Sequence, residues 1–496
     1  MTIRSSCQGK HPTSTYLKIY DFPGTEQQIY WNKCACNEHK ALLERHCLPP
    51  IDGFDPKSEP FKMFEREMVG FAKRVFPLRV SSDKEVMKNT RPSIRKRYQR
   101  ARNNLRANRV TYSGLLSRLQ AFVKYEKIPA GKVEDNKAPR LIQFRSYEYL
   151  YLLKKCLLGY KLVIKDEEKD VRWINDQTAR SVFTKTMDNY GCASALRYSW
   201  EQFVDPVGVC LDHSKFDGHY DTKLLEVEHA FWKAAFEQKP RVKKLLDRLL
   251  SDQIKQKGRT ANGLVYKTTG HRSSGEYTTS DGNTTSNGFM ISVWCKASGV
   301  SKYRLHVNGD DSVLIVERQD WARMLPLTFF RNFNMDTSLE VVADNFQQIS
   351  FCQASPIRVG DDLRWYMCKN PLRSLSRLQY CDSKFKNCLD RFRLGVGLCE
   401  LAVSSGVPIM QMAALYCIGS AESGKPLGSV DKYPALNSGN NSEVRRINPI
   451  TRDDFATAFG IGVAEQHQYE IAFAGKLRFT QDLQRVLIKY KTFAKN

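Results

Sequence analysis

The sequence predicts an α+β fold, with helices and antiparallel strands mixed along one chain. Helical periodicity is clearest over 59–75, where apolar residues recur three or four positions apart. Strand patterns are clearest over 305–307 and 313–316, which are rich in Leu, Val and Ile. The Asn-Gly-Asp-Asp segment at 308–311 joins these two runs, and Asn-Gly in this setting predicts a hairpin because both residues tolerate φ > 0.

The tip of this hairpin carries two adjacent carboxylates, Asp310 and Asp311. Like charges at this separation repel each other, so the pair is unusual in a purely structural turn. A divalent cation such as Mg²⁺, or Mn²⁺ in its place, removes the repulsion and can hold a phosphate through its remaining ligand positions. An ordinary Asp-rich turn is the alternative, and the rest of the chain has to distinguish the two.

The composition favours a polyanionic partner. The 496 residues suit two to four domains or one large enzyme with several subdomains, and 42% hydrophobic residues suffice for a sizeable core. Lys and Arg number 77 and Asp and Glu 53, which gives a net charge of +24. Nucleic acid and an anionic membrane surface both match this charge. The 14 Cys lack a regular spacing and no signal peptide is recognisable, which is typical of reduced thiols in the cytosol.

Two further segments have both a structural and a functional interpretation. The apolar window 394–420 contains Glu400 and Pro408, so we expect a buried helix and turn rather than a transmembrane segment. A Cys-x-Cys-x2-His run at 34–39 could contribute to a zinc site. Its spacing matches none of the common zinc frames, so a helical surface segment is favoured.

Cations are concentrated in two runs. The first, 91–109, has no acidic residue, which favours contact with a phosphate backbone over a solvated helix face, where the signs are normally mixed. In the second, 121–145, the alternation around 141–142 predicts a strand that could present guanidinium groups to a triphosphate. The cations of the two runs are Arg91, Arg95, Lys96, Arg97, Arg100, Arg102, Arg106, Arg109, Lys124, Lys127, Lys132, Lys137, Arg140 and Arg145.

Polar side chains gather at two further points. An apolar strand ends on Asp212, and Asp217 follows five residues later, so both carboxylates are expected near one sheet edge unless they only cap the next helix. Ser274, Thr279 and Asn283 lead into a segment with helical spacing. If the helix begins near Thr279, then Thr279 and Asn283 share one face, although such residues can also serve only as caps.

These elements together resemble viral RNA-directed RNA polymerases of the tombusvirus-like group, from positive-strand RNA viruses. Three of them follow the order of polymerase motifs A, B and C, and the basic run over 121–145 is similar to motif F. Phe351-Cys352-Gln353, followed by Pro356, is similar to motif E. The motif A, B and C segments are Asp212-x4-Asp217, Ser274-Gly275-x3-Thr279-x3-Asn283 and Gly309-Asp310-Asp311.

The resemblance implies a right-hand polymerase fold of fingers, palm and thumb, with a ferredoxin-like antiparallel palm sheet and many helices. It divides the chain into an N-terminal extension and fingers over 1–110, fingers with the basic NTP-binding motif over 111–200, a palm with an inserted fingers segment over 201–355, and a thumb over 356–496. The implied function is replication of a viral RNA genome by template-directed nucleotidyl transfer from NTPs to an RNA 3′-hydroxyl.

The resemblance also assigns roles to residues. Asp212, Asp310 and Asp311 are the implied catalytic ligands of two Mg²⁺ ions, with Mn²⁺ as a substitute. Cations neutralise the triphosphate, and a polar network reads the ribose 2′-hydroxyl. The implied triphosphate residues are Lys124, Lys127, Arg140 and Arg145, and the implied sugar-reading residues are Asp217, Ser274, Thr279 and Asn283.

One segment departs from the family pattern. These polymerases often carry a Lys in motif D that is proposed to protonate the leaving pyrophosphate, whereas 318–350 contains only Arg318, Arg323 and Arg331 as cations. Arg stays protonated and is a poor proton donor, so the donor is left open.

The resemblance implies several partners: a single-stranded RNA template, nascent RNA, NTPs, other viral replication proteins and host membrane-associated complexes. The expected location is the host cytoplasm at such complexes, without a transmembrane segment in this chain. Two alternatives stay open, a reverse transcriptase and a non-catalytic RNA-binding replication scaffold. The first usually has a bulky residue where Asp217 stands, and the second would be expected to lose a motif Asp. A metal-dependent nuclease would not need the Ser-Gly-x3-Thr-x3-Asn element.

Overall fold

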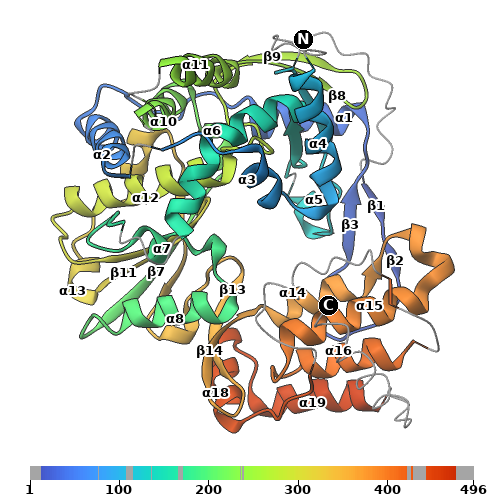
Figure 1. The fold of residues 1–496 in the computed structure, drawn as a ribbon. Coiled ribbons are helices and arrows are strands. Elements are labelled where there is room, and N and C mark those ends of the chain that lie inside the picture. Colours follow the sequence, from blue (N-terminus) through green and yellow to red (C-terminus); the bar gives the residue numbers. More distant parts are fainter. Residues whose placement is uncertain are drawn as a thin grey trace.

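The computed structural model describes residues 13–475, with gaps at 76–77, 108–115, 136, 166–170, 235, 237–239, 422–425 and 428–442. Helices and strands are mixed along the chain, which confirms the helix-and-sheet fold expected from the sequence. Figure 1 shows an upper part and a lower part, and the lower part is built largely by C-terminal helices. The strands β1 (Thr13–Thr15) and β3 (Gln28–Trp31) run between the two parts.

A four-stranded antiparallel sheet is formed by β10 (Arg304–Asn308), β11 (Asp311–Glu317), β7 (Pro206–His213) and β12 (Thr337–Ala343), in this order. Strands β7 and β11 are almost continuously buried, as expected for short apolar runs that are covered on both faces. They are neighbours in the sheet, so the polar residues at their ends meet at the same edge.

The hairpin between β10 and β11 is present, but its turn lies one residue further along than expected. Asn308 pairs with Asp311, so the two central residues are Gly309 and Asp310. Gly309 has a φ of 74°, and it alone of these four has a positive φ. Gly at the first central position supplies the conformation that a two-residue hairpin turn needs, which leaves Asn308 free to extend the strand. One carboxylate therefore lies in the turn and the other begins β11.

Three long helices, α2 (Glu59–Val75), α10 (Thr222–Ala234) and α12 (Thr279–Ala297), pack together, and α12 contacts the sheet at β10. The periodic apolar residues of α2, including Phe64 and Met68, are fully buried, which confirms the predicted helix. Helix α12 begins at the predicted residue and is buried over most of its length, although many of its side chains are Ser, Thr or Asn. Buried polar groups of this kind need hydrogen-bond partners inside the protein.

A second four-stranded sheet consists of β6 (Leu141–Phe144), β4 (Leu119–Val123), β8 (Lys255–Thr260) and β9 (Val265–Thr269), in this order. Burial alternates along β6, which confirms the strand expected around 141–142. The long helix α6 (Tyr147–Lys165) contacts α3 (Asp83–Lys88), α4 (Pro92–Arg106), α7 (Ala179–Val182) and α11 (Pro240–Ile254).

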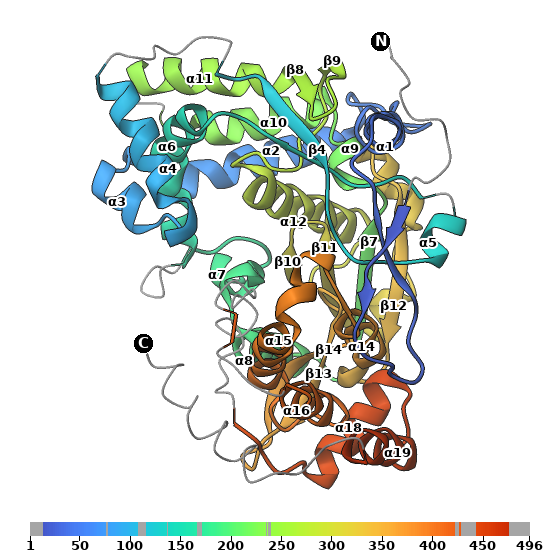
Figure 2. The ribbon, with the colours of Figure 1, turned by 90° about the vertical axis from the view of Figure 1, so that its right-hand side faces the viewer.

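The N-terminal strands connect distant parts of the chain. Strands β1 and β3 form a sheet with β5 (Ile128–Pro129), and β2 (Leu17–Lys18) pairs with β15 (Tyr380–Cys381). Figure 2 shows this N-terminal segment extending down to the C-terminal helices. The strands of the segment 13–31 therefore contact both the upper and the lower part of the molecule.

The window 394–420 forms the end of one helix and the whole of the next, α15 (Leu389–Ser404) and α16 (Met410–Gly419), which pack on each other. The expected buried helix and turn are thus confirmed. Across the parts of the chain that the structure describes, every helix is too short or too polar to span a bilayer.

The remaining elements are short or flank the larger ones. The Cys-x-Cys-x2-His run falls on α1, which confirms the helical segment expected there. Helix α1 continues into a π-helical turn, Leu42–His46. The others are α1 (Ala35–Ala41), α5 (Gly131–Glu134), α7 (Ala179–Val182), α8 (Asn189–Trp200), α9 (Phe216–His219), α13 (Arg318–Trp321), β13 (Ala354–Val359), β14 (Arg364–Lys369), α14 (Pro371–Leu378), α18 (Pro449–Phe459) and α19 (Val463–Ala474).

Candidate active site

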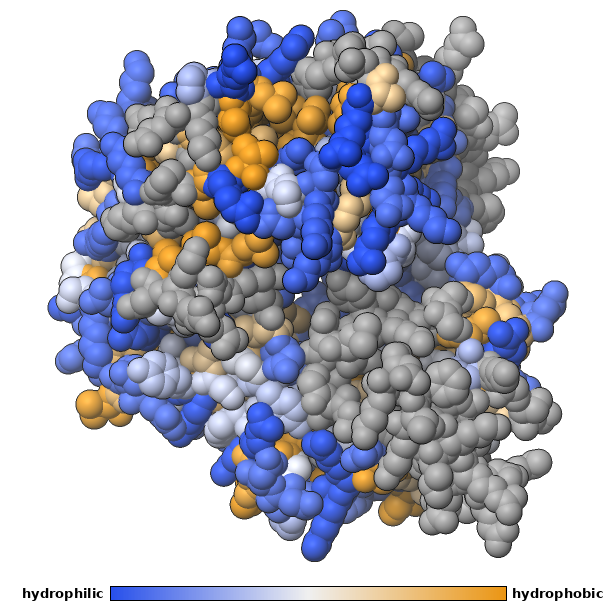
Figure 3. All heavy atoms as spheres, viewed as in Figure 1, coloured by the Kyte–Doolittle hydropathy of each residue, from blue (hydrophilic) through white to orange (hydrophobic). Residues whose placement is uncertain are grey.

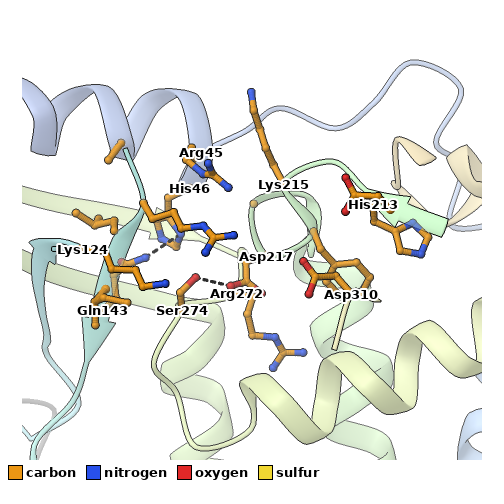
Figure 4. A pocket seen from close by; sticks show the side chains of 17 residues that line it. Arg45, His46, Lys124, Gln143, His213, Lys215, Asp217, Arg272, Ser274 and Asp310 are labelled. Carbon is orange, nitrogen blue, oxygen red and sulfur yellow. Dashed lines mark hydrogen bonds between the residues drawn. The ribbon is translucent and has the colours of Figure 1, made fainter. Parts of the chain in front are cut away.

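A pocket of about 350 Å³ lies where the central sheet faces the second sheet. Figure 4 shows Lys124 and Arg45 on one side of it and Asp310 on the other, with Asp217 between them. The acidic residues are Asp212, Asp217 and Asp310; the cations are Arg45, Lys124, Arg140, Lys215 and Arg272.

The acidic side is built by the ends of β7 and β11. Apolar residues of β7 are buried up to Leu211, and Asp212 is the first exposed residue after them. Leu211 pairs with Ser312, so extending the register by one residue places Asp212 opposite Asp311. The structure therefore brings together the strand ends that the sequence singled out, with Asp310 in the adjacent turn.

These carboxylates are crowded. Burial, and then the neighbouring Asp217 and Asp212, raise the pKa of Asp310 above its usual range. Burial, and then Asp310, Glu340 and Asp212, raise the pKa of Asp311 to about 6. Full ionisation of the group is therefore unfavourable unless a cation compensates the charge.

Side chains of α12 hold the turn through the backbone groups of the turn residues rather than through their carboxylates. The Gly309 N–H donates to Thr284 Oγ1 at 2.8 Å, and Asn287 Nδ2 donates to the carbonyls of Gly309 and Asp310 at 3.1 and 3.0 Å. His213, buried beside Asp212, contacts Asn287 Oδ1 through Nε2 at 2.9 Å. Sequence reasoning missed Thr284 and Asn287, although Asn287 continues the four-residue spacing from Thr279 and Asn283.

A polar network surrounds Asp217, which lies on α9. Asn283 Nδ2 donates to Asp217 Oδ1 at 2.7 Å, and the Ser274 hydroxyl donates to Oδ2. Asn283 Oδ1 is buried and accepts no hydrogen bond from the described residues. Thr279 donates instead to the Ser273 carbonyl at 3.0 Å, so its hydroxyl holds the loop before α12 and does not join the network.

The cationic side of the pocket contains two of the four predicted cations. Lys124 and Arg140 lie beside each other because the Lys124 N–H donates to the Arg140 carbonyl at 2.8 Å. Their side chains share Glu126 as a counter-ion, at 2.9 and 3.6 Å. Arg45, in the π-helical turn after α1, also lines the pocket, and no pattern around it in the sequence distinguishes it from a surface cation.

The structure does not bring Lys127 and Arg145 to this pocket. Lys127 Nζ donates to the carbonyls of Arg377, at 2.7 Å, and Tyr380, so it links the strand before it to the end of α14. Arg145 is 1% exposed and pairs with Glu276 while donating to backbone carbonyls. Arg145 directly follows β6 and continues the buried face of that strand, after Leu141 and Gln143, so its partners lie inside the protein.

The basic run 91–109 forms α4, up to its end at 106, while Arg109 lies outside the described residues. Tyr98 and Ala101 pack into the protein, and the exposed face carries Lys96, Arg97 and Arg100. Hydrophilic side chains cover this region in Figure 3. The run thus forms a helix with an exposed basic face, on which Arg97 also donates to the Tyr147 hydroxyl at 2.9 Å.

A sheet whose strand ends carry carboxylates, opposite a wall of Lys and Arg, defines a class of protein that handles a cation and a polyphosphate together. The chain belongs to the viral RNA dependent RNA polymerase family, whose family model matches residues 2–475. This finding confirms the tombusvirus-like resemblance, and it leaves the reverse transcriptase and scaffold alternatives without support.

Relatives with curated names agree with this family. The RNA-directed RNA polymerase of Cymbidium ringspot virus is 28% identical over 410 residues, covering 78% of this chain and 47% of that protein. That of Tobacco necrosis virus (strain D) is 28% identical over 425 residues, covering 81% and 56%. That of Melon necrotic spot virus is 31% identical over 298 residues, covering 59% and 36%. The chain spans about half the length of the curated relatives it matches.

Proposed function

We propose that this chain carries the polymerase activity of an RNA-directed RNA polymerase and extends RNA from NTPs on an RNA template. The observation that carries the proposal is the pocket in which Asp212 and Asp310 face Lys124 and Arg140. Incorporation of labelled NTPs on a single-stranded RNA template, measured with and without Mg²⁺, tests it. We expect a template-dependent product only with the cation, and a product that ignores the template sequence would contradict the proposal.

We further propose a right-hand arrangement, with the central sheet as the palm. In chain order its strands are β7, β10, β11 and β12, with α12 after the first, and this sequence of elements is compatible with a ferredoxin-like sheet. The proposed divisions are those drawn from the sequence: fingers over 1–110 and 111–200, palm over 201–355 and thumb over 356–496. Pairing of β2 with β15 would join the N-terminal extension to the thumb.

In the proposed reaction the RNA 3′-hydroxyl loses its proton and its oxygen forms a bond to the α-phosphorus of the NTP. The bond between this phosphorus and the bridging oxygen breaks, and pyrophosphate leaves and takes up a proton. Asp212, Asp310 and Asp311 would hold Mg²⁺, which when bound stabilises charge on the attacking and leaving oxygens. The crowding of these carboxylates supports the fit. Within the described ranges, no group of three or more His, Cys, Asp or Glu side chains is already placed to hold a metal ion.

The cationic wall would bind the triphosphate. Arg45, Lys124 and Arg140 line the pocket opposite the carboxylates, and fixed cations there would stabilise charge on the leaving pyrophosphate. A proton donor must be able to release its proton, which Arg does not do. The candidates are therefore the two lysines that line the pocket, Lys124 and Lys215.

Asn283→Ala is expected to narrow the preference for NTP over dNTP by about tenfold to a hundredfold, because unpaired buried polar groups cost about 1–3 kcal/mol each. Asn283 Nδ2 already binds Asp217, and its buried Oδ1 has no donor among the described residues, so a ribose 2′-hydroxyl can supply one. The measurement is incorporation efficiency for one matched NTP and dNTP pair. Asn262→Ala, at an exposed position in the turn between β8 and β9, serves as the control. An unchanged ratio in Asn283→Ala would mean that the sugar is read elsewhere.

Neutralising the exposed face of α4 tests RNA contact there. The combined variant Lys96→Gln, Arg97→Gln and Arg100→Gln is expected to weaken RNA binding equally for different sequences. The slope of log binding constant against log salt concentration should become shallower by about 2–3, because each phosphate contact releases counterions. Binding is measured by titration at several salt concentrations. Replacement of the exposed cations Arg241, Lys244 and Arg248 on α11 by Gln matches the charge change. An equal effect from both sets would indicate general attraction rather than a specific RNA path.

Partners beyond RNA and NTPs are also proposals. The net charge of +24 would attract the chain to RNA and to anionic membrane surfaces alike. We therefore propose that it acts in host cytoplasm at membrane-associated replication complexes, together with other viral replication proteins.

A further inference from the structure

A buried ion pair lies beneath the Asp217 network and has no counterpart in the sequence motifs. Arg272 donates through both terminal nitrogens to the two carboxylate oxygens of Glu228, from Nη1 to Oε1 at 3.1 Å and from Nη2 to Oε2. The two side chains are 1% and 0% exposed. Although Arg272 is among the residues that line the pocket, Figure 4 shows its side chain extending away from Asp310, and its guanidinium binds Glu228.

Glu228, on α10, is saturated with donors. Tyr220 Oη and Trp232 Nε1 each donate to its carboxylate at 2.9 Å, and the Arg272 guanidinium lies 4.1 Å from the centre of the Tyr220 ring. Burial opposes ionisation of Glu228, but Arg272 and these hydrogen bonds outweigh burial and hold the pKa of Glu228 below its usual range. The pair is therefore ionised, buried and bidentate, the form in which an Arg–carboxylate contact fixes geometry most firmly.

The pair touches both segments that hold Asp217. The Arg272 N–H donates to the Asp217 carbonyl at 2.9 Å, and Ser274, two residues later, binds the Asp217 carboxylate. On the other side Glu228 lies directly against Gly282, where a Cβ atom would be 2.5 Å from either carboxylate oxygen. Gly282 immediately precedes Asn283, so one ion pair sets the positions of both partners of Asp217.

We propose that Arg272 and Glu228 are positioning residues for sugar selection, which hold Ser274, Asp217 and Asn283 in the geometry that distinguishes a ribose from a deoxyribose. This inference rests on the proposed sugar-reading role of Asp217 and Asn283. Neither residue of the pair has to touch the nucleotide. Outer groups that orient directly contacting ones typically change function by about 10–100-fold when they are replaced.

Glu228→Gln tests the proposal, because it keeps the size of the side chain, removes the charge and replaces one accepting oxygen by an NH2 group that cannot accept from the Arg272 fork. We expect the NTP-over-dNTP ratio of incorporation efficiency to fall by about tenfold, with the loss in kcat for NTP larger than the rise in KM. Arg272→Lys keeps the charge but not the planar fork, so it should narrow the ratio by a smaller amount. It also provides the test if Glu228→Gln does not fold.

Asp454→Asn is the matched control. The Asp454 carboxylate is 3% exposed and pairs with the partly exposed Arg358 at 2.7 Å, so its neutralisation also weakens an ion pair with a buried carboxylate, but between α18 and β13 rather than at the pocket. It should lower the melting temperature and leave the sugar ratio unchanged. All variants are compared at equal folded fraction, which is checked by circular dichroism.

Three results would overturn the inference, and they differ in meaning. If Asn283→Ala narrows the ratio while folded Glu228→Gln and Arg272→Lys keep the wild-type value, the pair is only structural and the sugar-reading site stands. If Asn283→Ala leaves the ratio unchanged, the sugar-reading site itself is wrong and the inference fails with it. A fall in ratio with Asp454→Asn as well would show that any loss of stability moves this measurement.

Discussion

Asp310→Asn is expected to abolish nucleotide incorporation, with a fall of about a thousandfold or more. The substitution keeps the shape of the side chain and removes the negative charge that would attract a catalytic cation. The turn itself should not change, because Thr284 and Asn287 hold it through the backbone of Gly309 and Asp310. The expected result is thus a folded protein that binds RNA and does not extend it.

The stability of this variant gives an independent check. Burial and neighbouring carboxylates raise the pKa of Asp310, which means that its charged form is disfavoured in the folded state. A neutral Asn removes that conflict, so the melting temperature without added metal should stay equal or rise at pH 7. Asp361→Asn, at the exposed turn between β13 and β14, is the control and should retain wild-type incorporation. Substantial incorporation by Asp310→Asn would remove Asp310 from the proposed metal ligands.

The parts of the fold that the sequence predicted are those with local signals. The hairpin at 304–317, the strand that ends near Asp212 and the helix that begins at Thr279 each depend on residues within one short window. Even there the turn was displaced by one residue. Asn-Gly and Gly-Asp are both acceptable centres for a tight turn, and the choice depends on whether Asn308 pairs across the sheet.

The cations illustrate what local patterns cannot decide. The four cations Lys124, Lys127, Arg140 and Arg145 are indistinguishable in the sequence. In the structure, however, Lys127 and Arg145 bind partners away from the pocket. Arg145 finds Glu276, 131 residues away, and Lys127 finds the Arg377 carbonyl, 250 residues away. A buried partner at such a separation carries no signal near the cation, so the charge alone was assigned to the substrate.

The same limit explains the residues that were missed. Arg45 reaches the pocket only because the π-helical turn after α1 packs beside it, and Glu228 meets Arg272 across 44 residues. Asn287 is different, because it follows Thr279 and Asn283 at four-residue intervals on a helix that the sequence did predict. Extending the helix face by one more turn would have identified it as a residue that faces the hairpin.

Gly275→Ala is expected to lower incorporation by about a hundredfold, since misplacing groups by about 1 Å can cost that much. Gly275 has a φ of 136°, where a side chain is strained, and a Cβ atom there would collide with the Gln143 carbonyl oxygen of β6. The two segments cannot separate freely, because the Gln143 N–H donates to the Ser274 carbonyl at 3.0 Å. The loop must therefore shift, and it carries Ser274, which binds Asp217.

Gly299→Ala separates backbone strain from this collision. Gly299 has a φ of 70° after the end of α12, and a Cβ atom there would meet no other atom within 4 Å. Its replacement should cost about 1–3 kcal/mol of stability from strain alone and leave incorporation per folded molecule unchanged. Gly275→Ala should lose both stability and incorporation, with the sugar ratio narrowed because Ser274 moves. Melting curves and incorporation rates at equal folded fraction distinguish the two. If Gly275→Ala retained the same incorporation per folded molecule as Gly299→Ala, the close approach of Gly275 to β6 would not position the site. The loss of stability in both variants would then come from strain at positive φ.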